Sequence, residues 1–150
     1  MQTSEYEASL EGAAMEVLES MFFMTVTGSL ELPAGLEGDW VRVKLHFDGH
    51  RSGDFGVCAP YATARMIAGN FLADDESDID ISQIREVFGE LSNMICGTFL
   101  MRLDGGSAHD LSHPECDLTS TQLHGSTASK NLQLDDRSLC VWTNLEAPHE

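Results

Sequence analysis

The sequence predicts an α+β fold in which an antiparallel-rich sheet is covered by long helices. Apolar residues recur at helical spacing near the N-terminus and again after residue 81. The segment between these two regions is rich in β-branched and aromatic residues and is broken by glycines. A chain of 150 residues can bury a hydrophobic core without disulfides or metal, so we expect one domain over residues 1–150.

The first helix is expected over residues 10–22. Its apolar residues form one stripe, which consists of Leu10, Ala14, Met15, Leu18, Met21 and Phe22. Three glutamates, Glu7, Glu16 and Glu19, lie off that stripe. The pattern indicates an amphipathic helix with one face towards the core.

Three strands are expected after this helix, one over residues 23–32 and two within residues 40–59. In the second of them Val41, Val43, Leu45 and Phe47 alternate with polar residues, which predicts a strand with one buried face. Glycines within residues 48–53 predict that a hairpin joins it to the third strand.

Two more helices are expected in the middle of the chain. Pro60 can open a helix over residues 61–72. The acidic run that follows suits a solvated loop or a helix N-terminus, and it contains Asp74, Asp75, Glu76, Asp78 and Asp80. Asp80 and Gln83 resemble a capping box, which predicts a long helix from residue 81 to about residue 100, with Gly105 and Gly106 ending any continuation.

The last third of the chain carries weaker signals. Two strands are expected near residues 118–123 and 138–145. The polar segment 125–136 is interpreted as a loop.

The charge of the chain restricts its partners. With 8 lysine and arginine residues against 25 aspartates and glutamates, the formal charge is −17. Nucleic acid and anionic membrane surfaces would repel such a chain, so we expect neither as a partner. A protein or small ligand that offers local positive charge is expected instead.

The N-terminus and the cysteines indicate a cytoplasmic protein. The first residues are acidic where a secretion signal would be basic, and no apolar run approaches the roughly 18 residues of a membrane span. Cys58, Cys96, Cys116 and Cys140 lie far apart, and none belongs to a C-x-x-C pair. They are interpreted as buried, reduced thiols.

The long third helix has one face for packing and one for function. At 100° per residue, one arc carries Ile84, Val87, Phe88, Leu91, Ile95 and Phe99, which predicts burial against the sheet. The opposite arc carries Glu86, Glu90, Asn93 and Gly97. An acid and an amide three residues apart on a rigid helix, beside a glycine that permits close approach, indicate a docking face.

The string GELSNMICG, residues 89–97, resembles the E-x-x-N helix motif of the CheX, CheC and FliY chemotaxis phosphatases. The segment 47–72 is similar to the family's glycine-marked strand pair leading into a helix. The segment HDLSHPEC, residues 109–116, is similar to its proline-containing strand entry. The resemblance is greatest to CheX. It implies two pseudo-symmetric halves, in which Glu16 and Glu19 align with Glu90 and Asn93, so that only the second site is complete.

The resemblance also implies a reaction, a partner and residue roles. The expected activity is hydrolysis of the aspartyl phosphate on a CheY-like receiver domain, in chemotaxis or related two-component signalling. Asn93 would orient the attacking water, and Glu90 would pair with a lysine of the receiver. Glu86 and Gly97 would border the contact. The chain would need no cofactor of its own, because the receiver would bring the phosphoryl group and Mg²⁺. Homodimers occur in the family, although no sequence feature places an interface here.

Several other interpretations are weighed against this one. On the same docking face, the chain could serve as a non-catalytic adaptor that binds a receiver without hydrolysis. His109, His113 and Cys116, with Asp110 and Glu115, could supply metal ligands, but the zinc-type second pair of donors is missing.

Three further features have simpler explanations. Cys96 lacks the local signature of a nucleophile and is expected to be a buried thiol. The acidic run lacks the central glycine and the final glutamate of a calcium loop. Glu16 and Glu19 could form a second, partial docking site, but the solvated side of a helix is favoured.

Overall fold

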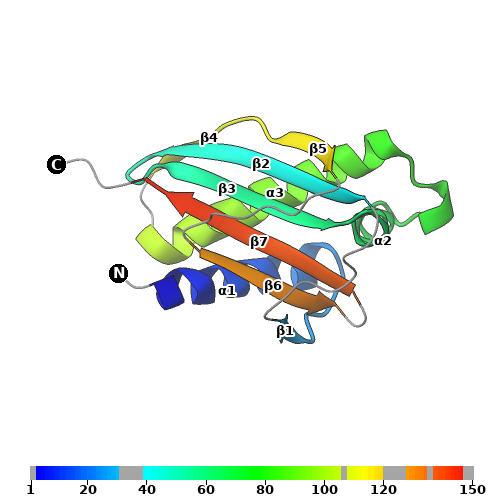
Figure 1. Ribbon diagram of the computed structural model, residues 1–150, viewed down its shortest axis with the longest axis horizontal. Helices are drawn as coiled ribbons and strands as arrows, with labels where there is room; N and C mark the ends of the chain where they lie inside the picture. Colours follow the sequence, from blue (N-terminus) through cyan, green and yellow to red (C-terminus); the bar gives the residue numbers. More distant parts are fainter. Residues whose placement is uncertain (1–2, 31–38, 106–107, 120–127, 135–136, 147–150) are drawn as a thin grey trace.

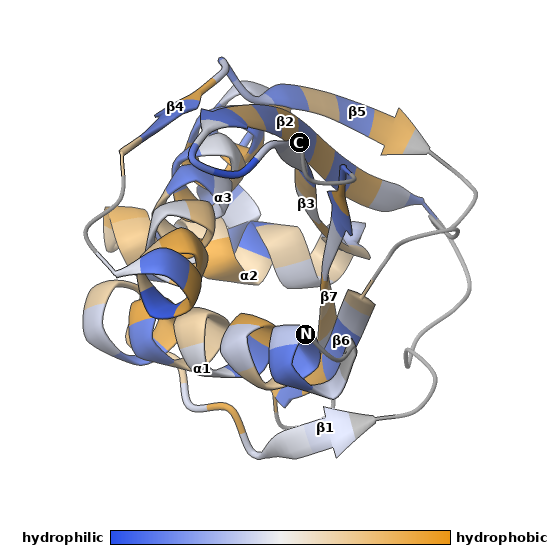
Figure 2. Ribbon diagram, turned by 90° about the vertical axis from the view of Figure 1, so that its left-hand side faces the viewer, coloured by the Kyte–Doolittle hydropathy of each residue, from blue (hydrophilic) through white to orange (hydrophobic). Residues whose placement is uncertain are grey.

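The computed structural model describes residues 3–30, 39–105, 108–119, 128–134 and 137–146. Within these residues a seven-stranded antiparallel sheet carries three α-helices on one face (Figure 1). Figure 2, turned by 90°, shows the helices on one side of the sheet, with apolar bands along them. The expected α+β class, an antiparallel sheet covered by long helices, is therefore confirmed. The helices are α1 (Thr3–Met21), α2 (Tyr61–Leu72) and α3 (Ile81–Asp104), with a short 3₁₀ turn η1 (Glu76–Asp78) before α3.

The sheet is ordered β1-β6-β7-β3-β2-β4, and β5 also pairs with β2. The strands are β1 (Gly28–Leu30), β2 (Trp40–Gly49), β3 (Gly53–Pro60), β4 (His109–Leu111), β5 (Glu115–Thr119), β6 (Ala128–Leu134) and β7 (Arg137–Leu145). The expected hairpin is confirmed, since β2 and β3 pair antiparallel with Val43 opposite Val57 and Leu45 opposite Phe55. Val41, Val43, Leu45 and Phe47 are all buried, as their alternation predicts.

The helices follow the sequence pattern closely. The second helix has the predicted bounds. The first begins earlier than expected, at Thr3, and the third runs beyond residue 100 to Asp104, where Gly105 takes a positive φ of 64° and ends it. On α1 the residues Leu10, Ala14 and Leu18 are buried, as is Phe22 directly after the helix, whereas Met21 is exposed despite its place on the apolar stripe.

Three predictions for the strands need correction. The segment 125–136 is not a loop throughout, because residues 128–134 form β6 between β1 and β7. The strand expected over 118–123 begins earlier, as β5 at Glu115, and its last residues lie outside the described ones. The strand expected over 23–32 is reduced to β1, and its final two residues likewise lie outside the described part.

One apolar core joins the helices to the inner face of the sheet. Phe22, directly after α1, stacks on Phe71 of α2 with ring centroids 4.7 Å apart. The ring centroids of Phe55 on β3 and Phe99 on α3 are 5.9 Å apart. The described helices include none that is long and apolar enough to cross a membrane. The relation between two pseudo-symmetric halves stays a prediction.

A buried ion pair ties the end of α3 to the β2–β3 turn. The Arg51 guanidinium donates to both carboxylate oxygens of Asp104, at 2.9 and 3.1 Å. The Asp104 side chain is only 4% exposed. The ring of His109 packs beside it, where Nε2 accepts the Arg51 backbone N–H at 3.2 Å. The chain therefore fixes the C-terminal end of α3 by charge as well as by packing.

Replacement of Asp104 by asparagine is expected to lower the free energy of unfolding by about 2 kcal/mol, because Arg51 loses a charged, two-point acceptor at a buried site. The hydrogen bonds from Arg51 hold the pKa of Asp104 below its usual value, against the opposing effect of burial. The contribution is therefore complete above about pH 4, the range of an unfolded aspartate, and is lost as the pH falls through the lower folded pKa. Urea denaturation of both proteins between neutral and acidic pH measures it.

The matched control is Asp117→Asn, because Asp117 is 66% exposed and lies 3.8 Å from Arg42. A surface pair of this kind contributes little. Equal effects of the two substitutions would contradict a special role for Asp104.

Candidate functional site

The site is built on α3, whose start and rotation are both fixed. The capping box is present: the Gln83 backbone N–H donates to the Asp80 carboxylate, and the Asp80 N–H donates to the Gln83 side chain, each at 2.9 Å. The six residues of the predicted packing arc are all buried, namely Ile84, Val87, Phe88, Leu91, Ile95 and Phe99. Their burial turns the opposite arc outwards.

The opposite arc is accessible, as predicted. Glu86, Glu90 and Gly97 are exposed, and Asn93 is half-buried. None of the three polar side chains makes a hydrogen bond or ion pair with any other described residue. An amide and two carboxylates are thus available to a partner.

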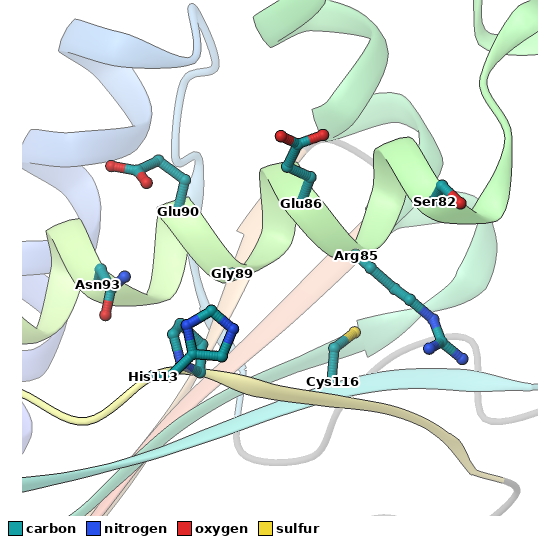
Figure 3. A pocket seen from close by; sticks show the side chains of 9 residues that line it. Ser82, Arg85, Glu86, Gly89, Glu90, Asn93, His113 and Cys116 are labelled. Carbon is teal, nitrogen blue, oxygen red and sulfur yellow. The ribbon is translucent and has the colours of Figure 1, made fainter.

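A groove of about 680 Å³ runs along this arc between α3 and the β4–β5 segment (Figure 3). Glu86, Gly89, Glu90 and Asn93 line it from α3, together with Ser82 and Arg85. The opposite wall consists of His113, Pro114 and Cys116. The groove therefore brings α3 together with the β4–β5 segment that follows it in the chain.

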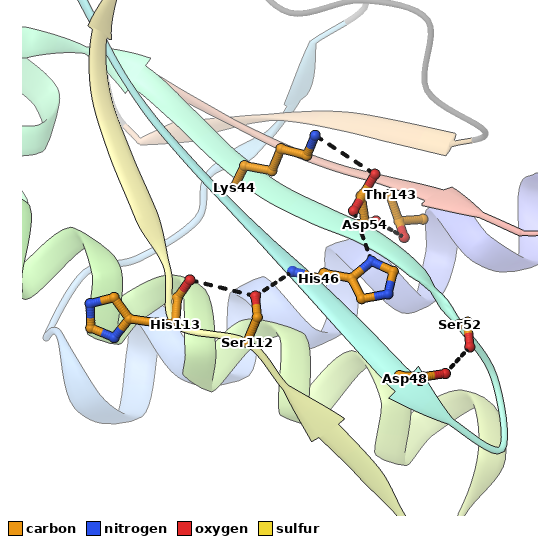
Figure 4. Close-up of polar contacts among 8 residues, drawn as sticks. All are labelled: Lys44, His46, Asp48, Ser52, Asp54, Ser112, His113 and Thr143. Atoms are coloured by element: carbon orange, nitrogen blue, oxygen red, sulfur yellow. Dashed lines mark hydrogen bonds and ion pairs between the residues drawn. The ribbon is translucent and has the colours of Figure 1, made fainter.

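The opposite wall is held in place by β2 and by contact with the helix. Ser112 Oγ accepts the backbone N–H of His46 at 2.8 Å (Figure 4), and the Ser112 N–H donates to the carbonyl of His46, also at 2.8 Å. A Cβ placed on Gly89 would lie 3.7 Å from Pro114, which is ordinary van der Waals contact. The segment therefore passes close to α3 at Gly89.

Two further hollows border the same arc. One, of about 520 Å³, lies between α3 and α1 and is lined by Asn93 and Gly97, with Glu16 and Met21 among the α1 residues. The other, of about 350 Å³, lies towards the end of α2 and is lined by Glu86 and Glu90. The arc is thus a ridge with hollows on both sides. Asn93 lines both the groove and the α1–α3 hollow.

The cysteines do not supply a nucleophile to this arc. Cys96 is fully buried on the packing side, and burial raises its pKa far above the usual thiol value. Cys116 lines the groove, but burial raises its pKa as well, with a smaller opposing effect from Arg85. A thiolate is the reactive form of cysteine, so neither thiol suits nucleophilic catalysis.

The structure does not bring the alternative metal ligands together. His109 lies in the buried network with Arg51 and Asp104, whereas His113 and Cys116 face the groove. Among the described residues, no three histidine, cysteine or acidic side chains form a group that could hold a metal ion. The acidic run before α3 is exposed, and Asp75 instead caps η1 by accepting the Ser77 N–H.

Glu16 and Glu19, the two glutamates in the second half of the first helix, face solvent. Both Glu16 and Glu19 are exposed, and Glu16 lies 3.5 Å from Arg102 of α3. Glu16 lines the α1–α3 hollow. The α1 residues that line this hollow include no amide side chain comparable to Asn93 of α3.

Six residues that line the groove were not assigned to it from the sequence, namely Ser82, Arg85, Gly89, His113, Pro114 and Cys116. The sequence placed His113 and Cys116 in a strand-entry segment, offered them as alternative metal ligands, and indicated a buried thiol at Cys116. Gly89, one turn before Asn93, is the sequence signal that could have indicated a close approach, since Pro114 lies 3.7 Å from the position that a Cβ there would take.

Comparison with known proteins identifies the family. The family model described as chemotaxis phosphatase CheX matches residues 41–132, more than half of the chain, including the whole α3 arc. The chain belongs to the CheX family of chemotaxis phosphatases, a family of hydrolases. No curated protein matches the chain by sequence.

Solved structures share the fold at low sequence identity. CheX from Desulfovibrio desulfuricans has a TM-score of 0.73 at 19% identity, covering 95% of this chain and 99% of that one. CheX from Vibrio vulnificus has a TM-score of 0.76 at 16% identity, covering 97% and 99%. A CheX–CheY–BeF₃–Mg²⁺ complex from Borrelia burgdorferi has a TM-score of 0.69 at 22% identity, covering 95% and 98%.

Replacement of Gly97 by alanine is expected to raise the free energy of unfolding by about 0.5–1 kcal/mol, because alanine loses less conformational entropy than glycine in a helix. A Cβ at Gly97 would meet no described atom within 4 Å. Urea denaturation measures the change. A loss of stability would instead mean that the arc at Gly97 is covered in the free protein.

Proposed function

We propose that this chain hydrolyses the aspartyl phosphate of a CheY-like receiver domain, and that Asn93 and Glu90 do so from the exposed arc of α3. The observation that carries the proposal is the pairing of an accessible amide and an accessible carboxylate, one turn apart, neither engaged by another described residue. Membership of the chemotaxis phosphatase family supports it. So does the shared fold with a CheX that forms a complex with CheY.

Asn93 acts by placing a water molecule. Its carboxamide can accept from and donate to the water, and it holds that water in line with the bond to be broken. The water oxygen forms a new bond to phosphorus, and the bond from phosphorus to the aspartyl oxygen breaks. The products are inorganic phosphate and the free aspartate of the receiver. Because the transition state is loose, placement contributes more than proton abstraction.

Glu90 acts as an anchor. Its carboxylate pairs with a lysine of the receiver site and so sets the position of Asn93 relative to the phosphoryl group. Glu86 and Gly97 flank the pair, and the missing side chain at Gly97 allows the partner's backbone to approach. Mg²⁺ arrives with the receiver as part of the substrate. We further propose that residues 1–150 form one CheX-like domain that works in the cytoplasm.

Replacement of Asn93 by alanine is expected to lower the rate of dephosphorylation on the order of a hundredfold, because the attacking water is no longer held. Affinity for the receiver should change little, since Glu90 remains. The measurement follows loss of phosphate from a phosphorylated CheY under single-turnover conditions. Wild-type binding without hydrolysis would favour the adaptor alternative, and an unchanged rate in the variant would contradict the role of Asn93.

Replacement of Glu90 by glutamine is expected to weaken receiver binding about tenfold, because a charge-assisted bond to lysine is lost. The defect should shrink at high salt, where the wild-type attraction is screened. Glu19→Gln on α1 is the matched control, since Glu19 is an exposed glutamate on another helix. Equal defects in the two variants would mean that α1 carries a second docking site.

A further inference from the structure

The surface beside Asn93 carries exposed apolar side chains. Met21 at the end of α1 is 46% exposed and Met101 on α3 is 61% exposed. Both line the hollow between α1 and α3 that Asn93 and Gly97 also line. Phe23, two residues after Met21, is the most exposed large apolar residue described, at 76%. Apolar side chains gathered beside polar functional groups are typical of docking surfaces.

The backbone conformation at Phe23 is unfavourable for a phenylalanine. Phe23 has a φ of 57°, in the left-handed region that favours glycine. The turn is fixed by two hydrogen bonds to the carbonyl of Leu18, from the N–H of Phe22 at 3.2 Å and of Met24 at 3.0 Å. A bulky aromatic residue is an outlier in this conformation.

The neighbouring residues determine which way Phe23 points. Phe22 is buried and stacked on Phe71, and Met24 is 8% exposed. The chain therefore anchors the residues on both sides of Phe23 in the core, while Phe23 itself is turned into solvent. Packing within the described residues does not explain why this position holds phenylalanine, since glycine would adopt the same backbone conformation with less strain. Such strain is a reason to look for a function.

We propose that Phe23, Met21 and Met101 form an apolar contact for the phosphorylated receiver domain. The inference rests on the proposed function. Its basis is continuity: Asn93 lines both the groove and the α1–α3 hollow, so a partner that reaches the Asn93 amide lies against the wall that contains Met21 and Met101. Phe23 follows Met21 by two residues and is exposed directly after α1.

The charge of the chain provides an independent reason for an apolar contact. A net charge of −17 provides no long-range attraction to the added negative charge of a phosphoryl group. Binding must then rely on short-range interactions. Burial of one phenylalanine and two flexible methionines supplies such an interaction without a charge match, and methionine adapts readily to an irregular partner surface.

Phe23→Gly is the decisive variant, because its expected effects on stability and on binding have opposite signs. Relief of the left-handed strain should increase the folding equilibrium constant roughly fivefold, measured by urea denaturation. Loss of the aromatic ring should raise KM for phosphorylated CheY about tenfold and leave kcat unchanged.

Met101→Gln, which keeps helix propensity and length, should raise KM as well. Asn93→Ala, by contrast, should lower kcat.

The matched control is Ala73→Gly. Ala73 ends α2 with a φ of 56°, so glycine should stabilise it similarly, but its side chain offers only a methyl group. The inference is overturned if Phe23→Gly and Ala73→Gly have equal KM values. It is also overturned if the Phe23 and Met101 variants change only the oligomeric state in sedimentation, since the surface would then join two copies of this chain.

Direct binding separates failure of this inference from failure of the proposed function. If the wild-type protein does not hydrolyse the phosphate, the proposed function fails. Affinity for CheY loaded with BeF₃⁻ and Mg²⁺ then decides the apolar contact. The apolar contact is supported if Phe23→Gly binds more weakly than the wild-type protein. It is overturned if the two proteins bind equally well, or if neither binds.

Discussion

Six apolar side chains of α3 are buried against the sheet and the neighbouring helices, and their burial sets the rotation of this helix about its axis. A rotation by one residue would move every side chain by about 100°, which would carry Asn93 away from the groove and bring a polar residue into the core. The capping box fixes where α3 begins, and the Arg51–Asp104 ion pair holds its far end. The arc that carries Glu90 and Asn93 is exposed because the packing arc on the other side of α3 must be buried.

Most of the helical structure could be predicted from the sequence, because a long amphipathic pattern repeats its signal over several turns. The bounds of α2 follow from Pro60 and from the polar run after Leu72. The strand β6 could not be predicted in this way. Only three of its residues are buried apolar ones, Ala128, Leu132 and Leu134, and lysine and asparagine between them disfavour strands. Its pairing between β1 and β7, which no local pattern encodes, holds it in the sheet.

The candidate site was likewise predictable on one side only. Glu86, Glu90, Asn93 and Gly97 share one helix, so their spacing alone places them on one face. The opposite wall depends on how β4 and β5 pair with β2, and such contacts between distant parts of the chain leave no periodic signal. His113 and Cys116 were therefore placed in a strand-entry segment, with metal ligation as the disfavoured alternative, and not in the groove. The structure separates them from His109. The role of each site residue in catalysis stays a prediction.

The acidity of the chain and the anionic nature of its proposed substrate need not conflict. Charges several Debye lengths apart are screened at physiological ionic strength, where that length is about 8 Å, so the net charge slows encounter more than it weakens a formed complex. Within the complex the arrangement of nearby groups decides. The lining of the groove includes Glu86 and Glu90 and, at Arg85, a cation without a hydrogen bond or ion pair to any described residue. A receiver that places a lysine beside Glu90 and an acidic side chain beside Arg85 would bind in a single orientation along α3. Charge would then select the orientation in which Asn93 meets the phosphoryl group, and the apolar wall beside Asn93 would supply affinity that does not depend on charge.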